Sequence, residues 1–154
     1  MGFLDSSTIA ANTVSIVPGA KLFHFGVLTS SVHMAWMRTI AGRLKSDYRY
    51  SAAIVYNNFP WPRSVDGTLE ESELVRQRIS QAAQAILDAR AQYPDCSLAD
   101  LYDPLTMPPE LRRAHQTNDA AVLAAYGFAP EATEEEIVAR LFEMYAELTS
   151  GRAE

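Results

Sequence analysis

Apolar positions in the second half of the chain recur at steps of three and four residues, which is typical of amphipathic helices. The pattern predicts a first helix over residues 69–93. Pro108-Pro109 can start a second helix, and Gly127 is placed to end it. Thr133 followed by Glu136 forms a capping box for a third helix. Three apolar stripes on three helices need one another, or a partner, for burial.

The first half of the chain mixes strand and helix patterns. Residues 13–17 and 21–25 flank a Pro-Gly turn, which predicts two short strands or a hairpin. Hydroxyl residues before an apolar helical face predict a helix from about residue 30 to 41. Residues 43–50 carry charged side chains at every second position, so a period of two would put those charges on one face of an extended ribbon. Residues 54–56 are a further β-prone run, which ends at asparagines and prolines.

Proline, serine, aspartate and glycine crowd a connector near residue 65, where the charge also changes. Residues 1–62 carry five basic and two acidic residues, a formal charge of +3, whereas the rest carries eight basic and seventeen acidic residues, a charge of −9. We predict an α+β chain: a small β-containing N-terminal segment with one helix (1–65), followed by an all-α helical C-terminal domain (66–154). The first part could face a polyanion, and the second part could not.

Composition places the 154 residues, 48% of them apolar, among ordinary globular proteins. Cys96 is the only cysteine, which excludes an intrachain disulfide and favours a reducing cytoplasm. No apolar run approaches the roughly 18 residues of a membrane-spanning helix, and residues 1–5 lack the regions of a signal peptide. We therefore expect a soluble cytoplasmic protein with no membrane partner.

Nucleotide and metal motifs are not apparent in the sequence. The seven glycines form neither GxGxxG nor GxxxxGK, the spacings that let backbone N–H groups approach a phosphate. His24, His33 and His115 lack metal-ligand spacing, and Cys96 has no second thiol nearby. We expect no metal site.

The run Asn58-Phe59-Pro60-Trp61 superficially resembles the Asn-Pro-Pro-Tyr type motif with which amino-methyltransferases hold an extruded base. Phe59 stands in place of the first proline, and too little chain precedes it for a cofactor-binding fold. The favoured interpretation is structural: Phe59 and Trp61 end a strand and pack between the two segments.

The strongest functional signal is a basic and aromatic stretch over residues 33–50. Lysine and arginine neutralise phosphates, and aromatic side chains support backbone or base contacts. Lys45 and Asp47 alternate, so both would point into one groove, where lysine donates to guanine and aspartate accepts from the paired cytosine. Together they could read one G·C pair, although a solvated strand face would explain the stretch nearly as well. The residues expected at the DNA backbone are Arg38, Arg43, Tyr48 and Tyr50.

Six longer phrases stand out: FHFGVLTS (23–30), HMAW (33–36), GRLKSDYRY (42–50), YNNFPWP (56–62), LYDPLTMPPEL (101–111) and AAYGF (124–128). Together they resemble the carboxy-terminal region of the MmeI-like family, which are large single-chain bacterial restriction-modification enzymes. The resemblance covers nearly the whole chain, and phrases of this length are far more specific than a spaced motif.

The resemblance implies the end of a target-recognition domain followed by the family's helical C-terminal domain. In that family, a nuclease segment, a helical connector and an adenine methyltransferase domain that uses S-adenosylmethionine precede these two parts. The family's base-reading positions fall here on Lys45, Asp47 and Arg49. Other members carry acid then base where this chain carries base then acid, which implies a preference for the opposite orientation of the base pair.

The sequence contains no cofactor loop, no Asn-Pro-Pro-Tyr type motif and no nuclease cluster of carboxylates and lysine. The resemblance therefore implies a non-catalytic portion of a DNA adenine methyltransferase, with no cofactor in this chain and S-adenosylmethionine in the methyltransferase domain. Its expected partners are double-stranded DNA and that methyltransferase domain. Two alternatives stay open: an acidic helical protein–protein interaction module without DNA binding, and an autonomous methyltransferase acting through Asn58 and Trp61.

Overall fold

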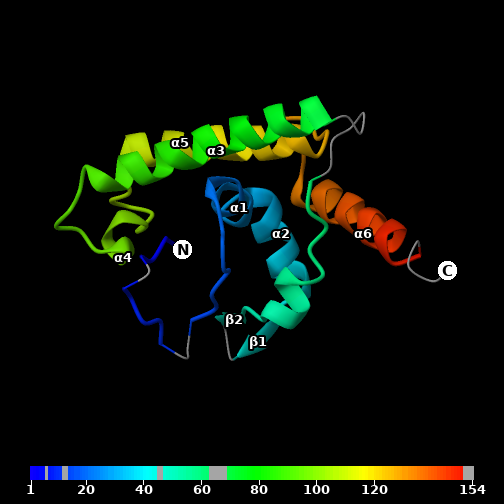
Figure 1. Ribbon diagram of the computed structural model, residues 1–154, viewed down its shortest axis with the longest axis horizontal. Coiled ribbons are helices and arrows are strands. Elements are labelled where there is room, and N and C mark those ends of the chain that lie inside the picture. Colours follow the sequence, from blue (N-terminus) through cyan, green and yellow to red (C-terminus); the bar gives the residue numbers. More distant parts are fainter. Residues whose placement is uncertain (6, 12–13, 45–46, 63–68, 151–154) are drawn as a thin grey trace.

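The computed structural model describes all of the chain except residues 6, 12–13, 45–46, 63–68 and 151–154. The predicted α+β class is confirmed, because a small antiparallel sheet lies in the first half and helices dominate the second (Figure 1). The elements, in chain order, are α1 (Leu22–Leu28), α2 (Ser31–Ile40), β1 (Gly42–Leu44), β2 (Asp47–Arg49), the π-helix η1 (Ala52–Tyr56), α3 (Leu69–Ala91), α4 (Leu98–Leu101), α5 (Pro109–Ala125) and α6 (Glu134–Ser150).

The long helices α3 and α5 lie side by side across the top of Figure 1. Helix α1 packs against α3, and α2 packs against α6. The β1–β2 hairpin lies at the opposite end of the molecule from α3 and α5 (Figure 1). Among the described residues, no helix combines the length and the apolar character needed to cross a bilayer.

Two clusters of buried side chains hold the helices together. The larger cluster joins α1, α2, η1, α3, α5 and α6 and includes Trp36, Ile79 and Leu141, none more than 2% exposed. The smaller cluster joins Phe25 of α1 to α3, α4 and α5. Both clusters combine side chains from the first 62 residues with side chains from the later helices, so the two segments share their core. The predicted boundary at residue 65 lies outside the described residues.

Helix ends follow the sequence signals closely. The predicted helix over 30–41 is α2, and the side chain of its N-cap residue Ser30 accepts a hydrogen bond from the His33 amide. Helix α5 begins at Pro109, and Gly127 follows its end with a φ of 74° that favours glycine. Thr133 and Glu136 form the predicted capping box before α6, with hydrogen bonds of 2.8, 3.0 and 3.3 Å.

Helix α1 approaches α3 and α5 most closely at Gly26. A Cβ on this residue would lie 2.6 Å from Cγ2 of Ile79 and 2.8 Å from Oδ1 of Asn118. The buried Asn118 side chain donates its amide to the Gly26 carbonyl at 2.9 Å. Glycine is needed for this approach, so the C-terminal helices fix the position of α1 and of α2, which follows it directly.

The strands predicted at 13–17 and 21–25 are wrong. The described residues 14–17 form no strand, and Leu22–Leu28 is helix α1. Phe23, Phe25 and Val27 are all buried, because α1 packs against α2, α3 and α5 at once. A short apolar run that is buried on several sides has no clear period, so its pattern does not separate strand from helix.

The β-strand interpretation of residues 54–56 is also wrong, because these residues belong to the π-helix η1. The indole Nε1 of Trp36 donates to the Val55 carbonyl at 3.1 Å. The side-chain amide of Asn58 donates to the carbonyls of Ala53 and Ile54 at 3.2 and 3.0 Å. These side chains take the place of a neighbouring strand as hydrogen-bond donors, so burial and capping override the β propensity.

Candidate nucleic-acid interface

The basic stretch folds into a hairpin rather than one continuous ribbon. Its facing pairs are Gly42–Arg49, Arg43–Tyr48 and Leu44–Asp47. Facing residues share one side of a sheet and successive residues alternate, so Asp47 and Arg49 lie on one face and Arg43 and Tyr48 on the other. The predicted single face for all four charges is therefore wrong for Arg43, because the chain turns back between the strands. Lys45 lies outside the described residues.

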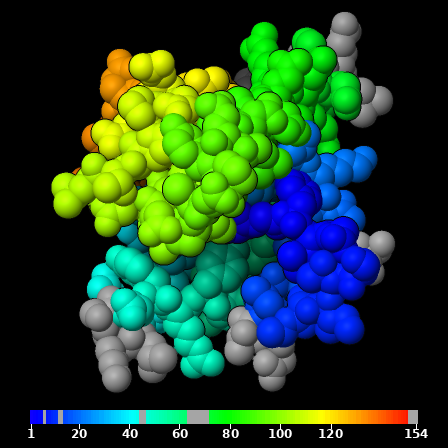
Figure 2. Space-filling view, turned by 90° about the vertical axis from the view of Figure 1, so that its left-hand side faces the viewer, coloured from blue at the N-terminus to red at the C-terminus, as the bar shows by residue number. Residues whose placement is uncertain are grey.

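The face with Asp47 and Arg49 is open to solvent. Both residues are exposed, and so is the whole of β2. Figure 2 shows the hairpin region, coloured cyan, at the lower end of the molecule and the green and yellow part of α3 to α5 at the upper end. The helices α3 and α5 therefore do not cover this face.

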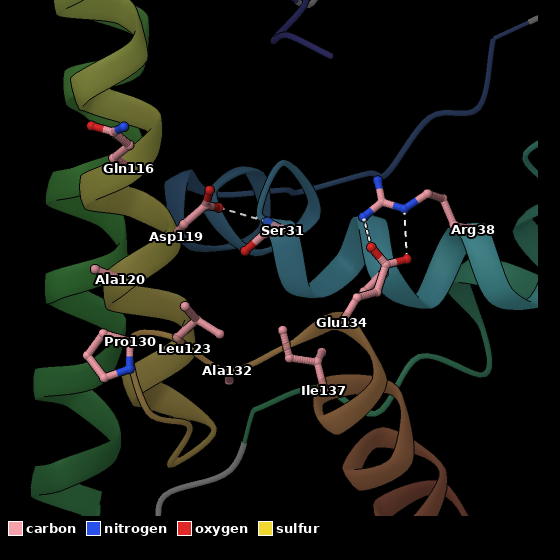
Figure 3. A pocket seen from close by; sticks show the side chains of 11 residues that line it. Ser31, Arg38, Gln116, Asp119, Ala120, Leu123, Pro130, Ala132, Glu134 and Ile137 are labelled. Carbon is pink, nitrogen blue, oxygen red and sulfur yellow. Dashed lines mark hydrogen bonds and ion pairs between the residues drawn. The ribbon is translucent and has the colours of Figure 1, made fainter.

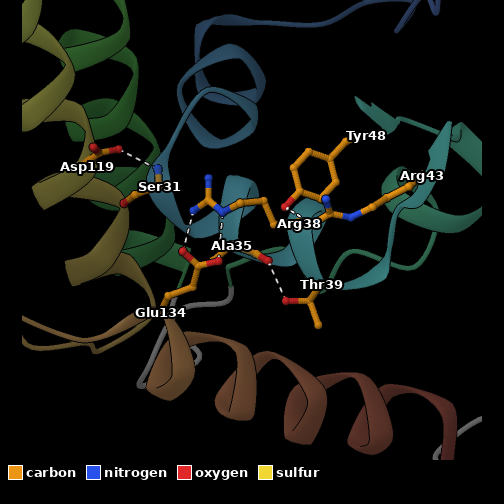
Figure 4. A network of polar contacts seen from close by, with 8 residues as sticks. All are labelled: Ser31, Ala35, Arg38, Thr39, Arg43, Tyr48, Asp119 and Glu134. Atoms are coloured by element: carbon orange, nitrogen blue, oxygen red, sulfur yellow. Dashed lines mark hydrogen bonds and ion pairs between the residues drawn. The ribbon is translucent and has the colours of Figure 1, made fainter. Parts of the chain in front are cut away.

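The opposite face of the hairpin carries a preformed cation–aromatic pair. The Arg43 guanidinium lies 4.5 Å from the centre of the Tyr48 ring, and its Nη2 donates to the Tyr48 hydroxyl at 2.9 Å (Figure 4). Tyr48 is 38% exposed. A guanidinium has five N–H donors, so this contact leaves Arg43 able to donate to a further acceptor.

Arg38 on α2 is engaged within the molecule. Its Nε and Nη2 donate to the two carboxylate oxygens of Glu134 at 2.9 and 2.7 Å, which joins α2 to the start of α6 (Figure 4). These hydrogen bonds raise the pKa of Arg38 and lower the pKa of Glu134. Tyr48 lies close enough to raise the pKa of Arg38 further. The two side chains are 36% and 50% exposed, so the pair stabilises the fold by less than about 1 kcal/mol.

His33 on α2 contacts Tyr50 at the end of the hairpin. Tyr50 follows β2 directly, and its hydroxyl lies 3.1 Å from Nε2 of His33. His33 is 1% exposed and its ring packs edge-on against Phe59 at 4.5 Å. Burial lowers the pKa of His33 to about 4 and raises the pKa of Tyr50 to about 12, so both groups are neutral at physiological pH.

The run from Asn58 to Trp61 packs between the two segments as we favoured, but it follows the π-helix η1 and not a strand. Phe59 and Pro60 are buried, and the hydroxyl of Tyr126, which follows α5, donates to the Pro60 carbonyl at 2.8 Å. Trp61 packs edge-on against Phe59. The side-chain amide of Asn58 is used to cap η1, so these residues join the two segments and do not form a pocket for a base.

A shallow cavity of about 440 Å³ lies between α2, α5 and α6 (Figure 3). Within it, Oδ1 of Asp119 accepts from the Ser31 amide at 2.7 Å and so caps α2 from a distant helix. Burial raises the pKa of Asp119. The Arg38–Glu134 pair forms another part of its wall. Among the described residues, no three His, Cys, Asp or Glu side chains gather as metal ligands do.

Reasoning from the sequence missed two contacts made by side chains of α2. The Arg38–Glu134 pair joins residues 96 positions apart, and the His33–Tyr50 contact joins residues 17 apart. No local pattern marks either one. The only available signal was that His33 falls on the apolar face of its helix, which indicates a buried imidazole that needs a polar partner.

Comparison with known proteins identifies this fold as a DNA target-recognition part joined to a helical domain, of the kind found in restriction-modification enzymes. The description "MmeI, target recognition domain" matches residues 1–63, and "MmeI, C-terminal domain" matches residues 72–152. The chain belongs to the MmeI family, which confirms the resemblance found in its sequence.

Two relatives support the assignment. DNA methyltransferase A of Bacillus subtilis (strain 168) is 39% identical over 149 residues, which are 97% of this chain and 16% of that protein. A solved structure of the Type IIL restriction-modification enzyme MmeI in complex with DNA is 49% identical, with a TM-score of 0.76 over 86% of this chain and 17% of that one. The chain thus spans about one sixth of the length of these relatives.

Proposed function

We propose that this chain binds double-stranded DNA and selects the target sequence of a restriction-modification DNA methyltransferase, without a catalytic role of its own. One observation carries the proposal: Asp47 and Arg49 lie on one face of the hairpin, and both side chains are exposed. Carboxylate and guanidinium groups are the acceptors and donors that read base edges in the major groove.

Base reading is assigned to Lys45, Asp47 and Arg49. The lysine would donate to the two acceptors of guanine while the aspartate accepts from the amine of the paired cytosine. Arg49 lies beside Asp47 on the same face and would contact a neighbouring base. A two-stranded ribbon is narrow enough to enter the major groove of B-DNA, which supports this arrangement.

Contacts to the DNA backbone are assigned to Arg43 and Tyr48, on the hairpin face opposite Asp47 and Arg49. Tyr50 was expected to contact the backbone as well, but its hydroxyl pairs with His33, so we assign it no phosphate contact. The stacked pair of Arg43 and Tyr48 presents a guanidinium whose remaining N–H groups suit a phosphate. Arg38 is included among the proposed phosphate contacts. Its share is expected to be smaller, because Glu134 already balances its charge.

The second proposed partner is the methyltransferase domain of a parent enzyme. Six large apolar side chains among the first sixteen residues are each about half exposed or more, and one of them, Ile9, is 95% exposed. A concentration of exposed apolar side chains of this kind marks an interaction surface. The exposed residues are Met1, Phe3, Leu4, Ile9, Val14 and Ile16.

S-adenosylmethionine would bind to that parent domain rather than to this chain. The cavity between α2, α5 and α6 does not fit the cofactor, because the start of α2 is already capped by Asp119 and the walls carry the Arg38–Glu134 pair. None of the described residues that line it is a glycine. A cytoplasmic location is proposed as well, supported by the single exposed thiol of Cys96.

The affinity of the chain for duplex DNA is expected to fall as salt rises. The sequence carries four cationic residues between positions 38 and 49, so the logarithm of the affinity should fall against the logarithm of the salt concentration with a slope of roughly −3 to −4. Fluorescence anisotropy of a labelled duplex measures this slope. The four side chains are those of Arg38, Arg43, Lys45 and Arg49.

Single substitutions sharpen this test. Arg43→Ala is expected to reduce the slope by about one. Arg38→Ala should reduce it by less, because of Glu134. Arg140 on α6 already forms ion pairs with Glu143 and Glu147, so Arg140→Ala serves as the matched control and leaves the slope unchanged. Undetectable or salt-independent binding of the wild-type chain contradicts the proposal.

A further inference from the structure

The hairpin is too short to hold its own orientation. Each strand has three residues, and an isolated two-stranded ribbon of this length is marginally stable in water. Its direction therefore depends on how its two ends are attached. The β1 end follows α2 directly, since the Ala41 amide still donates to the Met37 carbonyl at 2.9 Å.

The β2 end is attached by Tyr50. Its hydroxyl reaches Nε2 of His33, which lies about two turns from the end of α2. The hairpin is thus tied to α2 at two places, once through the chain after Ile40 and once through this hydrogen bond near the start of the helix. Two attachments about 10 Å apart along a helix fix the angle of the hairpin, which one attachment alone would not.

The contact between His33 and Tyr50 is specific in its chemistry. Among the described residues, the buried Nδ1 of His33 has no hydrogen-bond partner, so Tyr50 supplies the hydrogen bond of the imidazole ring. The ring itself is held edge-on by Phe59 and cannot turn toward solvent. A ring fixed by packing offers its Nε2 in one direction only, and the Tyr50 hydroxyl must come to that point.

We propose that His33 and Tyr50 are positioning residues for target recognition, which set the orientation of the base-reading face without touching a base. The proposal rests on the function proposed above. Tyr50 follows Arg49 directly and lies three residues after Asp47, so the anchor is adjacent to the reading side chains along the strand. Bidentate contacts to base edges tolerate displacements of about half an ångström, which a tilt of the hairpin would exceed.

The test is the variant Tyr50→Phe, which removes the hydroxyl and keeps the ring. The wild-type and variant chains are each mixed with a pool of random-sequence DNA duplexes, and the bound duplexes are sequenced. We expect discrimination to fall about tenfold at the base pair read by Lys45 and Asp47, with the salt slope and the melting temperature unchanged. Tyr145→Phe on α6 is the matched control, because the Tyr145 ring packs near Trp36 and away from the hairpin; it should leave all three quantities unchanged.

Variants of His33 test the same contact from the other side. Gln places an amide at about the reach of Nε2, so His33→Gln is expected to retain most of the discrimination, whereas His33→Leu should lose it as Tyr50→Phe does. Unchanged discrimination in Tyr50→Phe overturns the inference, and so does an equal loss of affinity for every sequence. If the wild-type chain itself enriches no sequence, the proposed function fails first and this inference fails with it.

Discussion

The double variant Lys45→Asp with Asp47→Lys is expected to select DNA with the opposite orientation of one base pair. The exchange moves the donor to the position of the acceptor, so guanine would be read on the other strand. A good bidentate contact is worth about 1–3 kcal/mol of discrimination. This corresponds to a preference of about fivefold to 150-fold for one orientation of the base pair over the other. Sequencing of the duplexes bound from a random pool measures the change directly.

The matched control exchanges the charges of another pair and preserves the net charge in the same way. Arg140 and Glu143 on α6 form an exposed ion pair at 3.0 Å. Arg140→Glu with Glu143→Arg is expected to leave the selected sequence unchanged. An unchanged preference in the hairpin variant would show that these residues do not read the base pair.

Truncation of Trp36 to alanine is expected to destabilise the protein strongly. The indole is 2% exposed, and the rings of Phe59, Phe142 and Tyr145 lie 6.3, 5.2 and 6.3 Å from it, centre to centre. Loss of a buried aromatic side chain costs about 3–5 kcal/mol, and the Val55 carbonyl also loses its donor. Domains are stable by about 5–15 kcal/mol, so this loss is a large fraction of the free energy of unfolding. Urea unfolding followed by circular dichroism measures it.

Trp36→Phe separates packing from hydrogen bonding at this site. It keeps an aromatic ring between α2 and α6 but removes the indole N–H, so the expected loss is about 1–3 kcal/mol. A loss below about 1 kcal/mol in Trp36→Ala would mean that the contacts between the two segments contribute little to stability.

The helical half of the chain was predictable because its signals are local. The helix over 69–93, the proline start of α5 and the capping box at Thr133 each depend on residues within one or two turns, and each is present in the structure. The same holds for α2. Patterns of this kind predict structure well because burial on one face and a cap at the end both favour the same helix.

The errors arose where burial comes from several sides or from distant residues. Helix α1 looks like a strand because three other helices enclose its apolar residues. The charged stretch at 43–50 alternates along the sequence, but alternation does not show where a ribbon turns back, so the face of Arg43 was misplaced. The partner of Arg38 lies 96 residues away on α6, and no pattern near Arg38 indicates it.

The most direct test of DNA reading by the hairpin is a map of the amide chemical shifts of the full chain as a DNA duplex is added. We predict that the largest changes fall on residues 42–50 and on the adjoining part of α2, with α3 and α5 little affected. Changes confined to helices α3, α5 and α6, with the amides of β1 and β2 unmoved, would contradict recognition by the hairpin and would favour an interaction module instead.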